Sequence, residues 1–136
     1  MMASRKIKTR TEDKAKAFEY LKKAEDNYAG MLRALEERNY NAAGTLAVQC
    51  AISAADAACV HEKGIRSTSD DHREVCEIVD SLPLKEAKDK CNLLKRILAQ
   101  KNLIQYESRN IHQKEAGEIA KSAERFYQWV HSAVNK

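Results

Sequence analysis

The sequence predicts an all-α fold, an up-and-down bundle of four long helices with an additional short helix between the second and third of them. Three observations favour helices. Only four glycines and one proline occur in 136 residues, so few positions interrupt a helix. No segment alternates apolar and polar residues over the length of a strand. Apolar residues instead recur at steps of three, four and seven along most of the chain.

The first long helix is predicted over residues 12–38, after a basic, disordered lead-in at residues 1–11. Thr11 offers a capping hydroxyl just before two acids, which favour the positive end of a helix. The lead-in itself is interpreted as a solvated arm or as a tail that contacts phosphate. Its basic residues are Arg5, Lys6, Lys8 and Arg10. The helix is predicted to bury Phe18, Leu21, Tyr28, Leu32 and Leu35.

The second helix is predicted over residues 40–63, with Gly64 as the left-handed residue that ends it. Alanines from Ala42 to Ala58 lie around most of its circumference. A helix that is small and apolar all round is expected to be buried and closely approached by its neighbours. We therefore expect this to be the central helix, with one face available to a second subunit.

The remaining elements follow from capping and breaking signals. A loop at residues 65–69 leads to the short helix, which Ser69 or Asp70 is expected to cap and which ends before Pro83. The third long helix is predicted from Leu84 to a break near residues 108–110. The fourth is predicted over residues 112–134, and its apolar stripe is Ala116, Ile119, Ala120, Ala123, Phe126, Tyr127, Val130 and Val134.

Composition limits the classes of protein to consider. The formal net charge of +4 is lower than a dedicated DNA-binding module usually carries. The cysteines, Cys50, Cys59, Cys76 and Cys91, form no Cys-x-x-Cys pair, so we expect buried, reduced thiols in a cytoplasmic protein. We also expect no apolar run of the roughly 18–20 residues that a membrane span needs, and hence no membrane partner.

The polar stretch at the end of the third long helix is the first candidate site. Lys101, Asn102, Tyr106 and Arg109 follow one another on a helix that is otherwise packed. On a helical wheel, Lys101 lies within about 40° of the apolar stripe, and a buried ammonium needs a partner. Tyr106 lies about 140° from Lys101, so the two converge only across a helix irregularity or between two subunits. In the alternative, structural interpretation these residues serve packing and solvation alone.

A weaker candidate precedes the short helix, where Arg66, Ser67 and His72 stand among hydroxyls and two aspartates. The alternative here is an ordinary cap followed by an acidic first turn. Asp70, Asp71 and His72 are consecutive and do not share a helical face, so no metal site is predicted.

Other chemistry-bearing residues receive structural interpretations. Trp129 is expected in the core or an interface rather than as a platform for a base. The basic residues along the third long helix are expected to form a solvated face: Lys85, Lys88, Lys90, Lys95, Arg96 and Lys101. No Gly-rich phosphate loop and no Ser-His-Asp set are found, so no cofactor is predicted.

Several segments taken together resemble the HEPN-domain family, small all-helical proteins often found beside minimal nucleotidyltransferases in bacteria and archaea. They are Tyr20-Leu21-Lys22-Lys23-Ala24, Asn39-Tyr40-Asn41-Ala42-Ala43, Gly64-Ile65-Arg66-Ser67-Thr68-Ser69-Asp70-Asp71-His72, Lys101-Asn102-xxx-Tyr106 and Ala123-Glu124-Arg125-Phe126. The likeness spans about residues 12–134 and implies a single HEPN-like helical-bundle domain there.

The resemblance also implies what the candidate site does. Ribonuclease members carry an Arg and, five positions later, a His that acts on an RNA 2′-hydroxyl while the Arg holds the phosphate. Here these positions are Lys101 and Tyr106. A lysine binds phosphate as a point charge without the planar fork, and a phenol, with an ordinary pKa of about 10, is a poor general base. The resemblance therefore implies a non-catalytic module that binds a nucleotide or RNA.

Non-nuclease members of the family further imply a homodimer with the signature segment near the dimer cleft. Two alternatives stay open. One is a weak, metal-independent endoribonuclease of toxin type, with Tyr106 or His72 in an adapted role. The other is a structural, antitoxin-like partner of a nucleotidyltransferase.

Overall fold

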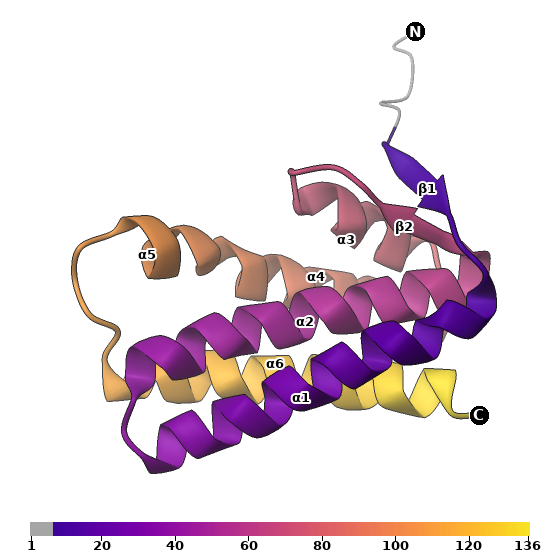
Figure 1. The fold of residues 1–136 in the computed structure, drawn as a ribbon. Helices are drawn as coiled ribbons and strands as arrows, with labels where there is room; N and C mark the ends of the chain where they lie inside the picture. The colour runs from indigo at the N-terminus through magenta and orange to yellow at the C-terminus, as the bar shows by residue number, and fades with distance from the viewer. Residues whose placement is uncertain (1–6) are drawn as a thin grey trace, which may run out of the picture.

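The structure is a computed structural model that describes residues 7–136, and almost all of its regular structure is helical. In chain order its elements are β1 (Thr9–Thr11), the 3-10 helix η1 (Lys14–Lys16), α1 (Ala17–Glu36), α2 (Tyr40–Lys63), β2 (Ile65–Ser67), α3 (Arg73–Asp80), α4 (Ala87–Ala99), α5 (Lys101–Tyr106) and α6 (Gln113–Val134). Helices α1, α2, α6 and the α4–α5 segment form the bundle, and α3 packs on α4 (Figure 1). The predicted all-α bundle with its additional short helix is confirmed.

Helix α2 is the centre of the bundle, as its composition predicted. Its bounds agree with the expectation, and Gly64 ends it in the left-handed region with φ 64°. By length and a mean hydropathy of 1.4, α2 could cross a membrane, a possibility that the sequence interpretation did not recognise. However, 72% of that apolar stretch is buried inside the bundle. Its alanines therefore serve as core, covered mainly by α1 and α6 of the same chain.

Helix α1 buries the predicted face only in part, since Leu21 is buried and Tyr28 and Leu35 are partly buried against the core. Phe18 is 52% exposed and Leu32 39% exposed, so two of the five expected core residues face solvent. The buried face instead consists of Ala17, Leu21, Ala24, Met31 and Ala34. Small residues allow the backbones of α1 and α2 to approach closely, and this close contact outweighs the burial of the larger side chains. The chain enters η1 with Asp13, not Thr11, as the cap, since Asp13 Oδ1 accepts from the Ala15 amide at 2.9 Å.

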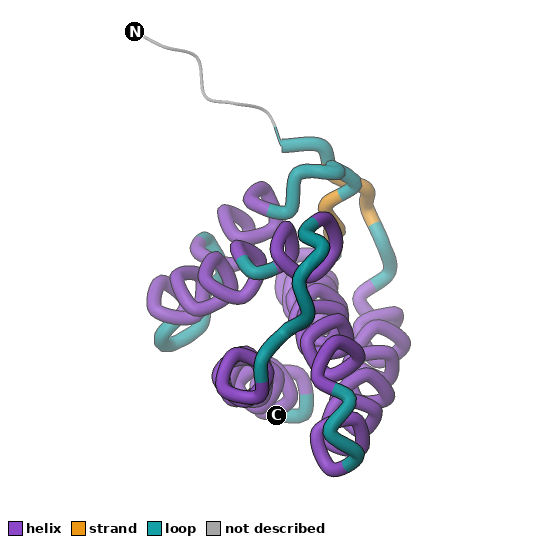
Figure 2. Tube along the Cα trace, turned by 90° about the vertical axis from the view of Figure 1, so that its left-hand side faces the viewer, coloured by secondary structure: helices purple, strands orange, loops and turns teal. Residues whose placement is uncertain are grey.

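Part of the expected disordered lead-in is ordered. Residues 9–11 form β1, which pairs antiparallel with β2, so that Arg10 lies opposite Arg66. The segment expected to be a loop at residues 65–69 thus begins as a strand. The two strands lie at the edge of the helices (Figure 2). Arg5 and Lys6 of the expected basic arm lie outside the described residues.

The third long helix is interrupted at Gln100, which separates α4 from α5. The predicted helix was continuous up to residues 108–110, whereas α5 ends at Tyr106. Before α3, the cap position is His72 rather than Ser69 or Asp70, and it makes no side-chain cap bond; Asp71 Oδ1 instead accepts from the Arg73 amide at 3.0 Å. Helix α6 matches its prediction, and its whole predicted apolar stripe is buried.

All four cysteines are free and buried, which confirms the expectation of reduced core thiols. Burial raises the pKa of both Cys50 and Cys76 to about 12. A thiol with so high a pKa is inert as a nucleophile at neutral pH. The cysteines therefore belong to the packing of the bundle.

Candidate functional site

A cavity of about 800 Å³ lies between the beginning of α3 and the α4–α5 segment, and we call it the α3–α5 cavity. Its volume falls within the roughly 300–1,000 Å³ range of small-molecule sites. Its polar lining residues are Asp70, Asp71, His72, Arg73, Glu77, Lys95, Lys101, Asn102 and Tyr106. The chain thus brings the start of one helix against the end of another to form one polar site.

Three residues of the predicted polar stretch share this cavity: Lys101, Asn102 and Tyr106. The helix interruption at Gln100 precedes all three and does not separate Lys101 from Tyr106. They line one cavity although they point to different sides of a short helix. The site therefore needs no second subunit to bring Lys101 and Tyr106 together, which removes the geometric reason for expecting a dimer.

The side chains of this stretch are available to a ligand. Neither Lys101 nor Asn102 has a hydrogen-bond or ion-pair partner among residues 7–136. The Tyr106 side chain is 77% exposed. An ammonium, an amide and a phenol ring together can bind a phosphate, hydrogen-bond a base edge and stack on a planar group.

His72, a weaker candidate from sequence, belongs to the same cavity. Burial of the imidazole, followed by the positive charge of Lys101, lowers the pKa of His72, while Asp71 and Asp70 oppose the shift. Since an unperturbed histidine has a pKa of about 6.5, His72 is neutral at pH 7. It can accept or donate a hydrogen bond without adding charge to the cavity.

The α3–α5 cavity is lined by both positively and negatively charged side chains. Arg73 forms a two-pronged pair with Asp71, with Nε to Oδ1 at 3.0 Å and an amino nitrogen to Oδ2 at 2.9 Å. This pairing leaves Lys95 and Lys101 as the cations that have no hydrogen-bond or ion-pair partner in the described part of the chain. Two such cations suit a ligand with one or a few phosphates rather than a long duplex backbone.

Contacts beneath α5 fix its position on α2. Ile104 and Ile111 lie directly over Gly44, where an added Cβ would stand 2.7 Å from Ile111 Cδ1 and 3.3 Å from Ile104 Cδ1. The following loop is held by Asn41, whose Oδ1 accepts from the Ile111 amide at 2.8 Å. The absence of a side chain at Gly44 therefore sets how closely α5, and with it Lys101, approaches the bundle.

Arg109, the fourth residue of the predicted stretch, does not line the cavity. Its guanidinium pairs with both oxygens of Glu115, at 2.8 and 2.6 Å. Glu115 Oε1 also accepts from the His112 amide at 2.9 Å, as part of the capping box of α6. Arg109, and then His112, lower the pKa of Glu115 to about 2. Arg109 thus holds the loop between α5 and α6.

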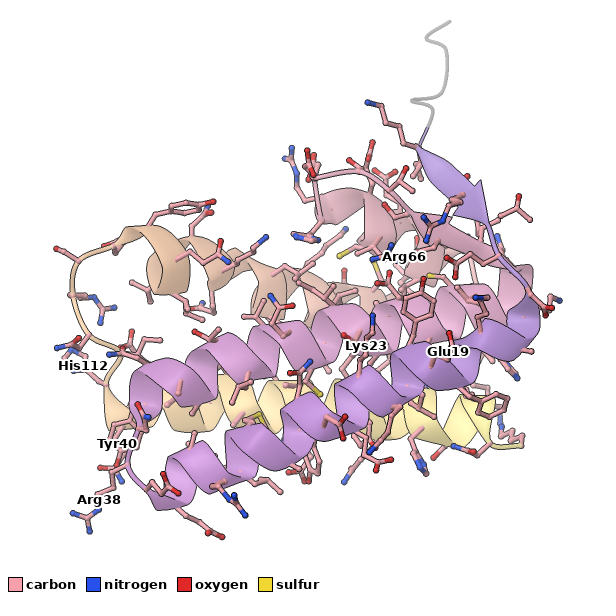
Figure 3. All side chains as sticks on the ribbon, viewed as in Figure 1. Glu19, Lys23, Arg38, Tyr40, Arg66 and His112 are labelled. Atoms are coloured by element: carbon pink, nitrogen blue, oxygen red, sulfur yellow. The ribbon has the colours of Figure 1, made fainter. Side chains whose placement is uncertain are left out.

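Arg66 and Ser67 are also placed away from the α3–α5 cavity, in β2. The Arg66 Nε donates to Oδ2 of the buried Asp56 at 3.3 Å, and its guanidinium lies 5.2 Å from the centre of the Tyr20 ring. Figure 3 shows Arg66 near Lys23, well along the bundle from His112 at the end where α6 begins. Arg66 therefore joins the small sheet to the helices.

Sequence reasoning missed Lys95 and Arg73 as lining residues. Lys95 was assigned to a solvated face, yet it shares the cavity with Ala99, Asn102 and Tyr106. These positions are spaced i, i+4, i+7 and i+11, which places them on one side of a helix. That spacing could have identified Lys95 as a residue of the site. The position of Arg73 in the cavity could not be predicted from spacing, because it depends on how α3 packs on the rest of the bundle.

Metal ligation finds no support within residues 7–136, where no group of three or more His, Cys, Asp or Glu side chains is placed to hold an ion. Comparison with protein families gives one match. A family model described as HEPN domain matches residues 17–133, which includes every residue of the α3–α5 cavity. No curated protein matches the chain.

Proposed function

Because the chain belongs to the HEPN-domain family, we propose that it binds a nucleotide, free or within a short stretch of RNA, in the α3–α5 cavity. One observation carries the proposal: Lys101, Asn102 and Tyr106, which stand at the family's signature positions, line one cavity together with His72. Lys101 and Lys95 bind the phosphate, Asn102 hydrogen-bonds the base, and Tyr106 supplies a stacking surface. Stacking of a base on an aromatic ring contributes about 1–3 kcal/mol.

The proposed activity is binding without cleavage. A ribonuclease of this kind needs a fork-shaped cation on the phosphate and a base near neutral pKa. Lys101 lacks the fork, and Tyr106 supplies a phenol where a base is needed. Both groups remain suited to recognition, since neither phosphate contact nor stacking requires a proton transfer.

Calorimetric titration tests this proposal, with 5′-AMP, 5′-GMP and a short single-stranded RNA as ligands. Binding at micromolar to millimolar concentrations is expected, and Lys101→Gln should weaken it by on the order of 10-fold. For the RNA, the slope of log affinity against log salt should fall by about 0.7 in this variant, because one phosphate contact is lost. Lys114→Gln, which removes the same charge from the exposed start of α6, is the matched control. No binding at millimolar ligand, or equal binding by both variants, would refute the proposal.

A second candidate function is a weak, metal-independent endoribonuclease, and one specific observation favours it. His72 is held neutral at pH 7 in the same cavity as Lys101, so it has the protonation state of a general base. Incubation with RNA separates the two functions. Cleavage that survives chelation and disappears in both His72→Gln and Lys101→Gln would support the enzyme, whereas intact RNA would leave binding alone.

The proposal extends to partners and compartment. We expect a cytoplasmic protein that forms a homodimer and associates with a nucleotidyltransferase, as in a toxin–antitoxin pair. Two exposed apolar side chains on α1, Phe18 and Leu32, support an association with another protein. Light scattering at tens of micromolar tests the dimer, and a monomer there would exclude it. Co-purification with a nucleotidyltransferase, without ligand binding by this chain, would instead favour the structural, antitoxin-like role.

A further inference from the structure

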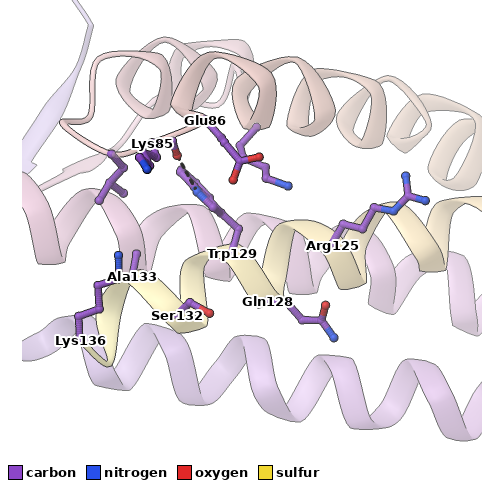
Figure 4. A pocket seen from close by; sticks show the side chains of 10 residues that line it. Lys85, Glu86, Arg125, Gln128, Trp129, Ser132, Ala133 and Lys136 are labelled. Carbon is purple, nitrogen blue, oxygen red and sulfur yellow. Dashed lines mark hydrogen bonds between the residues drawn. The ribbon is translucent and has the colours of Figure 1, made fainter.

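A second cavity lies outside the site described above, between the beginning of α4 and the C-terminal half of α6. Its volume is about 450 Å³, and we call it the Trp129 cavity. It shares no lining residue with the α3–α5 cavity. Figure 4 shows Trp129 below the turn that carries Lys85 and Glu86, with Arg125 further along α6. The two cavities are therefore separate sites.

The Trp129 cavity is strongly cationic. Its charged lining side chains are Lys85, Lys90, Arg125 and Lys136, against one acidic side chain, Glu86. None of these five side chains forms a hydrogen bond or an ion pair with another described residue. Four cations that the bundle leaves unpaired attract an anion from solution. This cavity thus differs from the α3–α5 cavity, where carboxylates balance the cations.

Trp129 occupies a fixed position in this charged surface. Its indole Nε1 donates to the Lys85 carbonyl at 3.0 Å, and its ring lies 5.8 Å from the centre of Phe126 at an angle of 49°. Phe126 is fully buried, whereas Trp129 is partly exposed. Because the indole N–H is already bonded, what Trp129 offers a ligand is its ring surface. A ring held in place in this way favours stacking of a planar group.

The turn that accepts the indole hydrogen bond has an unusual backbone. Glu86 has φ 67° and ψ 11°, in the left-handed region. A non-glycine residue pays roughly 1–2 kcal/mol to adopt this conformation. The turn places the Lys85 carbonyl at the edge of the indole, where it accepts from Nε1, and brings Lys85 and Glu86 to the rim of the cavity. Backbone strain of this kind is concentrated at functional sites.

We propose that the Trp129 cavity is a second binding site, which takes a nucleotide whose base stacks on Trp129 and whose phosphate is bound by the surrounding cations. A ligand that uses both the ring surface of Trp129 and the surrounding cations must be planar and anionic. An acidic peptide would satisfy the cations but would leave the ring surface of Trp129 without a matching group. This inference goes beyond the function proposed for the α3–α5 cavity, since neither its residues nor its ligand contacts are shared.

The test uses the fact that Trp129 is the one tryptophan of the sequence, so its fluorescence reports on this cavity. We expect saturable quenching by 5′-AMP and by a short oligo(A) RNA. Adenosine and inorganic phosphate, which each lack one half of the ligand, should bind on the order of 10-fold more weakly than AMP. Tighter binding of the RNA than of AMP identifies an RNA segment as the source of the nucleotide, and equal binding identifies the free nucleotide.

Substitutions inside and outside the Trp129 cavity test whether the fluorescence change arises from ligand binding there. Arg125→Gln removes an exposed side chain and should weaken AMP binding by about 3–10-fold. Lys114→Gln, on the same helix outside the cavity, should leave it unchanged. Glu86→Gln, which removes the single acid, should strengthen it. Lys101→Gln should leave the Trp129 signal intact, so this inference and the proposed function can fail separately.

Three results would overturn the inference. The first is unchanged fluorescence at millimolar AMP and RNA. The second is equal quenching by an oligo-glutamate peptide, which would assign the cavity to an acidic protein segment. The third is equal affinity in the Arg125→Gln and Lys114→Gln variants.

Discussion

The ammonium of Lys101, in α5, lowers the pKa of the His72 imidazole, which precedes α3. Lys101 lies in α5 and His72 in the segment before α3, and both line the same cavity. The titration of His72 therefore reports on the charge at Lys101. This electrostatic coupling makes the site accessible to experiment even before its ligand is known.

Lys101→Gln should raise the pKa of His72. The variant removes the positive charge, but burial of the imidazole is the larger cause of the shift, so the pKa should remain below the ordinary value of about 6.5. The measurement is an NMR pH titration of the histidine rings, with His72→Gln to assign the resonance. An unchanged pKa would mean that Lys101 does not approach His72 in solution. Lys114→Gln serves as the charge-matched control.

Gly44→Ala should destabilise the bundle and displace the site. The added Cβ would meet Ile111 at 2.7 Å and Ile104 at 3.3 Å, and such overpacking costs typically about 1–3 kcal/mol. Because Ile104 belongs to α5, we also expect weaker nucleotide binding in the α3–α5 cavity.

Gly117→Ala provides the matched comparison for this variant. Gly117 lies within α6, and a Cβ there meets nothing within 4 Å. It should stabilise the protein by about 0.5–1 kcal/mol through helix propensity alone. Urea unfolding measures both changes. Equal effects of the two substitutions would contradict the packing described for α5.

The Asp56→Asn substitution should reduce the dependence of the unfolding free energy on pH. Asp56 is 6% exposed, and burial, opposed by Arg66, raises its pKa from 3.8 to about 6. A raised carboxyl pKa means that the folded state binds a proton more tightly, so stability falls as pH rises from about 4 to 6. This change amounts to about 3 kcal/mol.

The free energy of urea unfolding at pH 4 and pH 7 checks this prediction. The difference between the two pH values should shrink by about 2–3 kcal/mol in Asp56→Asn. The exposed Asp89→Asn variant should keep the wild-type dependence. The same dependence in Asp56→Asn and wild type would show that Asp56 titrates normally.

Glu115→Gln should lower the melting temperature much more at pH 7 than at pH 2. Arg109 holds the pKa of Glu115 at about 2, below its unfolded value of about 4.5. The stabilisation is therefore complete above about pH 4.5 and is lost as pH falls through 2. Thermal melts at both pH values test this, and high salt should reduce the effect because both side chains are partly exposed. Glu118→Gln, on the exposed face of α6, should behave as wild type at both pH values.

The parts of the fold that could be predicted are those that a single local sequence feature determines. Gly64 ends α2 as expected because only a residue without Cβ adopts the left-handed conformation at no cost. The apolar stripe of α6 is likewise buried throughout. In α1, by contrast, Phe18 was expected inside and lies outside. Small side chains determine how α1 packs on α2. A prediction that considers only large apolar residues does not detect them.

The candidate site was predicted in part. Lys101, Asn102 and Tyr106 lie together, but Arg109 pairs with Glu115 and Arg66 with Asp56. Pairings between distant segments cannot be read from spacing along one helix. The same is true of β1 and β2, whose hydrogen bonds join residues 9–11 to residues 65–67. Trp129 was expected in the core or an interface, and it does pack partly buried against the core, but its cationic surroundings come from both α6 and the turn before α4 and could not be predicted from either segment alone.

The most direct test of the central claim is the pH titration of His72 by NMR with and without saturating 5′-AMP. A phosphate bound at Lys101 offsets the charge that depresses the pKa of His72. We therefore expect AMP to raise this pKa in the wild-type protein and to have little effect on it in Lys101→Gln. A His72 titration curve that AMP leaves unchanged, at concentrations where calorimetry detects binding, would contradict the placement of the ligand in the α3–α5 cavity.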